Sequence, residues 1–172
     1  MPGEGQRHKK IREDVVNFIE NQIAVYGLHL ECFQSHGGGC GKLMLYERYV
    51  DGESKRDKWT GDVDIAIVDS FDKTVRAIIE IKHKDNRPKD IAGIIGAVAI
   101  SSVMKSKKGL YTIGKVNLYI VVDSREVTDN KMSQMERISD LINKEMSNLE
   151  SVVIKDEIDF KALVDLRKMI MV

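Results

Sequence analysis

The chain has 172 residues, of which 42% are hydrophobic, and this is enough to build the core of one domain without disulfides or a structural metal. Its 27 basic and 27 acidic residues balance, so charge gives no global indication of a nucleic-acid-binding protein, and any such contact must rest on local patches. The longest apolar run, 91–103, is too short to span a membrane. The start lacks a signal-peptide core, and two cysteines are no disulfide framework, which together predict a cytoplasmic protein without membrane contact.

The N-terminal third begins with an amphipathic pattern. From 8 to 26, apolar residues recur every three or four positions, which predicts a helix with one apolar stripe: Ile11, Val15, Phe18, Ile19 and Ile23. Residues 28–33 alternate as a strand does, 36–41 form a glycine-rich loop, and 42–49 predict a further strand. Residues 51–60 are polar and charged around the single tryptophan.

Two segments rich in Val and Ile predict a β-hairpin in the middle of the chain. Residues 62–69 and 74–82 are expected to be its strands, and Ser70-Phe71-Asp72-Lys73 its turn.

The second half of the chain predicts alternating helices and strands. Pro88 is expected to open a helix that runs to about 106, and its many small residues indicate close packing on a sheet. Residues 115–123 predict an interior strand, 132–149 a helix, 151–155 a short strand and 160–170 a final helix. The helix at 132–149 should turn four side chains inward: Met135, Ile138, Leu141 and Ile142.

This element order predicts an α/β fold in a single domain, residues 1–172. Its central mixed β-sheet should be flanked by helices, as a sandwich.

The expected hairpin register places acidic residues opposite each other. With antiparallel pairing around a five-residue connection, Asp69 lies opposite Val75, and the same register sets Asp64 against Glu80. Directly opposed side chains are about 4.5–5.5 Å apart at Cβ, close enough for two carboxylates to share a divalent ion. Two carboxylates this close repel each other unless a cation lies between them, so the pair is a candidate metal site.

The same register gives two other residues a place near this pair. Lys82 should lie one strand step from the carboxylates, and Asp62 should face Lys82.

These residues resemble the PD-(D/E)xK nuclease superfamily. That family has an aspartate at the start of one strand and Glu-x-Lys in the next; here Asp64 precedes the apolar run Ile65-Ala66-Ile67-Val68, and Glu80-Ile81-Lys82 follows the turn. The family's proline is replaced by Val63. The resemblance covers mainly 61–82, and it implies a restriction-endonuclease-like sandwich with an αβββαβ core and further C-terminal helices.

The resemblance also implies a chemistry. Asp64, Glu80 and the carbonyl of Ile81 would hold Mg²⁺, for which Mn²⁺ could substitute, and Lys82 would position the attacking water. The expected activity is endonucleolytic hydrolysis of DNA phosphodiesters. Because cutting both strands of a duplex with one site per chain usually requires two-fold symmetry, a homodimer is expected.

Several other residues are candidates for supporting roles. An accessory acid could be Asp62, or Glu13 or Glu20 of the first helix, and the sequence does not choose between them. DNA contacts are expected from basic residues and the tryptophan near the hairpin: Lys55, Arg56, Lys58, Trp59 and Lys84. The alternative for the tryptophan loop is a solubilising surface segment.

Other interpretations of these patterns stay open. The acids could belong to a solvated sheet face, or the chain could be a catalytically inactive nuclease-fold protein that binds DNA or a protein partner. Four potential zinc ligands, whose alternative is a buried thiol beside an ordinary loop, occur within twelve residues: His29, Cys32, His36 and Cys40. Gly41-Lys42 does not begin a phosphate-binding loop, because Leu43 stands where Ser or Thr is required. The preferred DNA substrate is not evident from the sequence.

Overall fold

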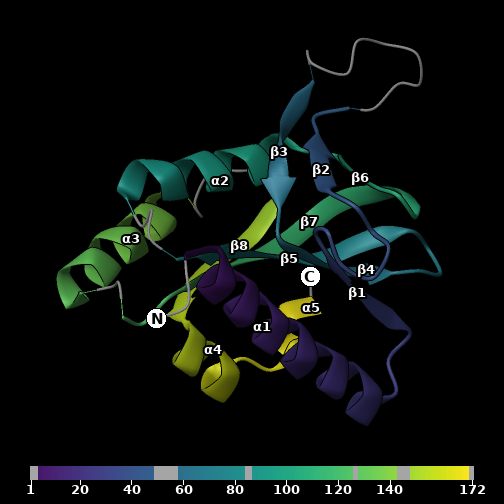
Figure 1. Cartoon of the computed structure of the whole chain (residues 1–172). Coiled ribbons are helices and arrows are strands. Elements are labelled where there is room, and N and C mark those ends of the chain that lie inside the picture. Colours follow the sequence, from purple (N-terminus) through teal and green to yellow (C-terminus); the bar gives the residue numbers. More distant parts are fainter. Residues whose placement is uncertain (1–3, 49–57, 84–86, 126–127, 143–147, 171–172) are drawn as a thin grey trace.

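A computed structural model describes residues 4–48, 58–83, 87–125, 128–142 and 148–170 of the chain (Figure 1). Within these ranges it has eight strands and five helices. In chain order they are α1 (Glu4–Tyr26), β1 (Leu30–Gln34), β2 (Leu43–Tyr46), β3 (Trp59–Val63), β4 (Ile65–Asp69), β5 (Thr74–Lys82), α2 (Pro88–Ile100), β6 (Val103–Ser106), β7 (Gly109–Val122), α3 (Asp129–Ile142), β8 (Leu149–Asp156), α4 (Glu157–Leu163) and α5 (Leu166–Ile170).

The strands form one open, mixed sheet in the order β1-β4-β5-β7-β6-β2-β3, with β8 paired to β7 off this path. Strands β5, β7 and β8 are parallel neighbours, whereas the other pairings are antiparallel. The predicted α/β class and the mixed sheet flanked by helices are therefore confirmed. No described helix combines the length and apolarity needed to cross a membrane.

Two apolar clusters, one on each side of the sheet, form the core. On one side α1, α4 and α5 pack over β4, β5 and β7, and on the other α2 and α3 do so (Figure 1). The expected stripe of the first helix is confirmed, since Ile11, Val15 and Ile19 are almost fully buried. Met135 of α3 is buried as expected, and the side chains of Ile138, Leu141 and Ile142 lie outside the described residues.

The hairpin register agrees with the prediction near the candidate site and differs near the turn. Ile65 pairs with Ile79 and Ile67 with Ala77, as expected. A β-bulge then leaves Arg76 without an opposite residue in β4, so Asp69 faces Thr74 rather than Val75. The bulge puts Arg76 in contact with Asp69 and Asp72, at 3.1 and 2.5 Å.

Several predicted bounds were wrong. Strand β7 begins at Gly109, six residues before the predicted start of the interior strand, and Leu149, predicted to end a helix, begins β8. The helix expected over 88–106 ends at Ile100. Ser101 has extended backbone, and the residues from Val103 form β6, paired with β2 and β7. The strand expected over 62–69 is divided between β3 and β4. The final helix is likewise divided into α4 and α5, with extended backbone at Val164.

Candidate active site at the edge of β5

The division between β3 and β4 falls at Asp64. In a regular strand Val63 and Ile65 would share a face, yet Val63 packs in the cluster under α2 and Ile65 in the cluster under α1. The pleat therefore breaks at Asp64, and β3 leaves the edge of β5 to pair with β2. This departure leaves the last residues of β5, which include Glu80 and Lys82, without a paired strand on this side.

The carboxylate of Asp64 takes the place of the missing strand. The backbone N–H of Ile81 donates to Asp64 Oδ2 at 2.9 Å, and the N–H of Asp64 donates to Glu80 Oε2 at 3.2 Å. The carbonyl of Asp64 accepts from Ser35 at 2.7 Å, so both backbone polar groups of this residue are bonded. Asp64 and Glu80, predicted to be neighbours, are brought together.

The other two expected site groups lie at the same edge. Lys82 Nζ is 3.2 Å from Glu80 Oε1, and its side chain is 21% exposed. The carbonyl of Lys82 accepts a hydrogen bond from the backbone N–H of Asp123, which follows β7. Because neighbouring residues of a strand direct their backbone groups to opposite sides, the N–H and the carbonyl of Ile81 face Asp64. The Ile81 carbonyl is thus on the same side of β5 as Asp64, as the resemblance implies for a metal ligand.

Helix α1 contributes cations to this site rather than an acid. His8 Nε2 lies 3.3 Å from Asp64 Oδ2, and Arg12 Nη1 lies 3.8 Å from Asp64 Oδ1. Glu13 is exposed and pairs with Lys9 at 3.7 Å. Glu20 follows Arg12 by eight residues, about 12 Å along the helix, and lines a pocket beside β1. The structure does not place either glutamate with Asp64.

The electrostatics of the site follow from its burial. Burial raises the pKa of Glu80 to about 7, the negative charge of Asp64 adds to the increase, and Lys82 partly opposes it. The hydrogen bond to Asp64 raises the pKa of His8, while burial opposes the increase. The backbone of Ile81 also raises the pKa of His8.

The sequence suggested a pair of carboxylates whose charge is not compensated, and the structure differs. Arg12, Lys82 and His8 surround Asp64 and Glu80, and the charges of the arginine and the lysine compensate those of the two carboxylates. The sequence could not indicate this compensation. The apolar stripe of α1 predicts which face of the helix is buried, but it does not predict which strand the first turns of the helix lie against.

A second charged cluster, not anticipated from the sequence, joins α1 to the strand ends beside the site. Asp123, fully buried at the end of β7, lies 3.1 Å from Arg7 Nε, 2.8 Å from His83 Nδ1 and 3.2 Å from Arg125 Nη2. Burial would raise the pKa of Asp123, but hydrogen bonds from Arg125, Arg7 and His83 outweigh it and hold that pKa well below its ordinary range. Arg7 also reaches Glu157 at 2.7 Å.

The remaining candidates near the hairpin are placed elsewhere or not described. Asp62 was expected opposite Lys82, but it lies in β3, pairs with Met44, and binds Lys42 Nζ and Trp59 Nε1, both at 3.2 Å. Trp59 is 52% exposed. The carbonyl of Lys58 accepts a hydrogen bond from the N–H of Glu47. Three expected DNA contacts lie outside the described residues: Lys55, Arg56 and Lys84.

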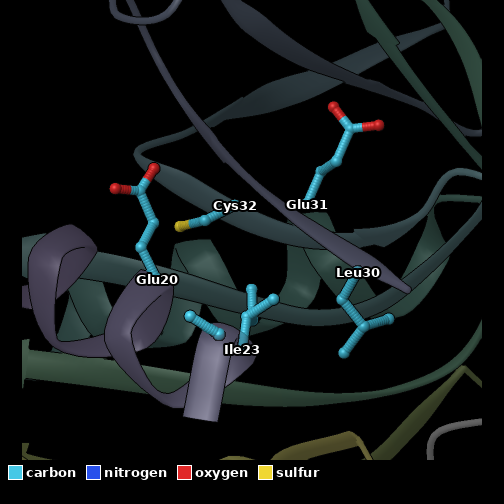
Figure 2. Close-up of a pocket in the computed structure, with 6 residues that line it drawn as sticks. Glu20, Ile23, Leu30, Glu31 and Cys32 are labelled. Carbon is cyan, nitrogen blue, oxygen red and sulfur yellow. The ribbon is translucent and has the colours of Figure 1, made fainter. Parts of the chain in front are cut away.

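The proposed zinc ligands do not gather around one point. Cys32 packs on the α1 side of the sheet and Cys40 on the α2 side, while His29 and His36 are exposed. Cys32 instead lines a pocket of about 290 Å³ between α1 and β1, which Figure 2 shows with Glu20 and Glu31 at its sides. Burial, together with Glu20 and Cys40, raises the pKa of the Cys32 thiol to about 12.

The donor set at Asp64 suits a hard divalent cation of low protein coordination. Nowhere in the described ranges are three His, Cys, Asp or Glu side chains grouped to hold a metal. Two carboxylates and a carbonyl are the oxygen ligands that Mg²⁺ accepts when water and phosphate complete its shell. Because His8 Nε2 lies 3.3 Å from Asp64 Oδ2, its ring must turn aside before a cation reaches this oxygen.

The comparisons with known proteins add no further constraint. No protein-family model matches the chain, and neither a curated protein nor a solved structure matches it.

Proposed function

We propose that the chain is a metal-dependent deoxyribonuclease of the PD-(D/E)xK type, with a restriction-endonuclease-like fold, that acts on DNA as a homodimer. One observation carries the proposal: Asp64, Glu80 and Lys82 meet at the side of β5 that lacks a paired strand, where β3 departs. This arrangement is built from a broken strand and a buried glutamate, both of which lower stability and therefore indicate a functional site.

Each residue has a role that follows from its position. Asp64, Glu80 and the Ile81 carbonyl would hold Mg²⁺ or Mn²⁺. Bound there, the metal would supply Lewis acidity toward the phosphate and lower the pKa of a bound water. Lys82 Nζ, beside Glu80, would orient the attacking water and stabilise the charge that develops on the phosphate oxygens.

A second candidate is an inactive nuclease-fold protein that binds DNA or a protein partner. The observation that favours it is the compensation of both carboxylates by Arg12, Lys82 and His8, since a site balanced in this way needs no metal.

A cleavage panel separates the two functions. Duplex, nicked, junction and single-stranded DNA would be incubated with Mg²⁺ or Mn²⁺ and the parent, Lys82→Ala or Lys115→Ala. Lys115 is the matched control, because it is 64% exposed and pairs only weakly, at 3.6 Å, with Glu150. We expect cleavage of at least one substrate, a loss of about 100-fold or more in Lys82→Ala, and an unchanged rate in Lys115→Ala. DNA binding without cleavage would favour the inactive protein.

A further inference from the structure

Strand β1 lies at an edge of the sheet, and its outer side has no strand beside it. Within the described ranges only β4 pairs with β1, in a regular antiparallel register. Proteins commonly protect a free edge with lysine, proline or a β-bulge. The sequence of β1, Leu-Glu-Cys-Phe-Gln, contains neither residue, and its pairing shows no bulge. This edge is therefore open to a further strand.

The direction of the backbone groups identifies which residues would bond such a strand. The N–H of Ser35 donates to the carbonyl of Asp64, in register with the pairing of β1 and β4. Because backbone groups alternate in direction along a strand, those of Cys32 and Gln34 face away from β4. The carbonyl of Gln34 is already bonded to the N–H of Gly37. In the described part of the chain, nothing bonds the N–H of Cys32, its carbonyl, or the N–H of Gln34.

A pocket of about 290 Å³ lies at this edge, between β1 and α1 (Figure 2). It is lined only by residues of these two elements and by none of β4, so it lies beside the sheet edge rather than over the sheet. The side chains of Leu30 and Cys32 pack on the α1 side. Directly opposed residues of neighbouring strands share a face, so a residue placed opposite Cys32 would direct its side chain to this pocket.

The lining of the pocket suits a long basic side chain. Ile23 and Leu30 provide apolar surface, and Glu20 is an exposed acid at the side of the pocket. Among the described residues, no basic group pairs with Glu20. Glu31, the other acid of the lining, has only a pair with Lys108 at 3.4 Å, in which both side chains are at least 40% exposed. A lysine or arginine could lay its methylene groups on the apolar surface and bring its charge to Glu20.

We propose that the free edge of β1 binds an extended peptide segment of a partner protein as an additional strand, with a lysine or arginine of that segment in the pocket beside Cys32. Backbone hydrogen bonds to Cys32 and Gln34 contribute affinity, and the pocket selects the side chain. The inference goes beyond the proposed nuclease function and does not depend on it, because β4 separates β1 from β5 and the candidate active site.

The test is a titration of the ¹⁵N-labelled full chain with short peptides, followed by NMR. The probe is the acetylated and amidated peptide Ser-Val-Lys-Val-Ser. One control peptide has Glu in place of Lys, and another is N-methylated at the lysine, which removes the backbone donor that would face the Cys32 carbonyl. The protein variants are Glu20→Gln and, as the matched control, Glu13→Gln. Glu13 is an exposed acid of the same helix and pairs with Lys9.

We expect the lysine peptide to shift the amide signals of Cys32 and Gln34, because both N–H groups gain an acceptor. The N-methylated peptide and the Glu peptide should bind more weakly. Glu20→Gln should weaken binding of the lysine peptide by about two- to fivefold, as for the loss of an exposed ion pair, and Glu13→Gln should not change it.

Three results would overturn the inference. The first is the absence of shifts at Cys32 and Gln34, and the second is equal binding of the N-methylated or the Glu peptide. The third is a shift of the same two signals with protein concentration alone, which would place a second copy of the chain at this edge.

Discussion

Glu80 and Asp64 fix one another through the backbone: the N–H of Asp64 donates to Glu80 Oε2 at 3.2 Å, and the N–H that follows Glu80, that of Ile81, donates to Asp64 Oδ2 at 2.9 Å. Each carboxylate therefore satisfies a donor that the departure of β3 would otherwise leave unpaired. Both acids are oriented before any ligand arrives, which is the condition for a preorganised site.

The burial of Glu80 makes the stability of the chain depend on pH. Its pKa is about 7 in the folded chain against 4.5 as the ordinary value, so between these two pH values the unfolded state ionises first. The free energy of unfolding should then fall, by on the order of 3 kcal/mol, as the pH rises through this window. Glu80→Gln lacks this loss, so we expect it to be more stable than the parent at pH 8 and about equal at pH 4.5.

Urea unfolding in EDTA at pH 4.5, 6 and 8 measures this difference. Glu150→Gln, an exposed acid, is the control, and its difference from the parent should stay small at every pH. A Glu80→Gln protein less stable than the parent at pH 8 would contradict the assigned burial of the charge.

His8 is expected to compete with a metal at Asp64. Its Nε2 lies 3.3 Å from Asp64 Oδ2, one of the oxygens that would hold the ion. His8→Ala should therefore bind Mg²⁺ more tightly than the parent, by about tenfold or less, which isothermal titration calorimetry can measure at pH 7.5. Weaker binding in His8→Ala would instead identify His8 as a ligand, and Asp64→Asn should bind least of all.

Asp123 is expected to contribute most to the attachment of α1. It is fully buried and accepts hydrogen bonds from Arg7 and His83, whose side chains are themselves only 21% and 11% exposed. Asp123→Asn removes the buried negative charge that faces Arg7 and His83, although Arg7 keeps its pair with Glu157, and should cost roughly 3 kcal/mol of unfolding free energy. Glu150→Gln, which breaks only an exposed pair, should cost less than about 1 kcal/mol. Equal losses of unfolding free energy in the two variants would show that the Asp123 cluster does not stabilise the attachment of α1.

Cys32 is expected to be a poor nucleophile. Its pKa of about 12 lies three units above the ordinary value of 9, so its thiolate fraction at pH 8 falls about 1000-fold. In the Cys40→Ser variant, modification by a disulfide reagent should be slow in buffer and fast in urea. Rapid labelling of the folded protein would mean that the pocket beside β1 admits the reagent and solvates the thiol.

The site acids could be predicted from the sequence because their signals are local. Alternation along β5 and the short turn before it are enough to set Asp64 against Glu80. The bulge at Arg76 did not disturb this pairing, since it lies on the turn side of the correctly paired residues Ile67 and Ala77. Strand β6 escaped prediction because its four residues continue an apolar helix with no proline or glycine between them.

The cations around the acids could not be predicted, because they depend on contacts between distant elements. His8 and Arg12 are ordinary polar positions of an amphipathic helix, and only the packing of α1 against β5 brings them to Asp64. The Asp123 cluster likewise joins four segments of the chain, through residues 7, 83, 123 and 157. No periodicity connects such residues.

The packing of α1 also has a consequence for synthesis of the protein on the ribosome. The apolar stripe of this first helix is covered by Phe160, Leu166 and Met169, and Arg7 binds Glu157, 150 residues further along. Part of that stripe therefore stays exposed on a nascent chain until the C-terminal helices α4 and α5 have emerged from the exit tunnel. The ion pair between Arg7 of α1 and Glu157 likewise forms only then.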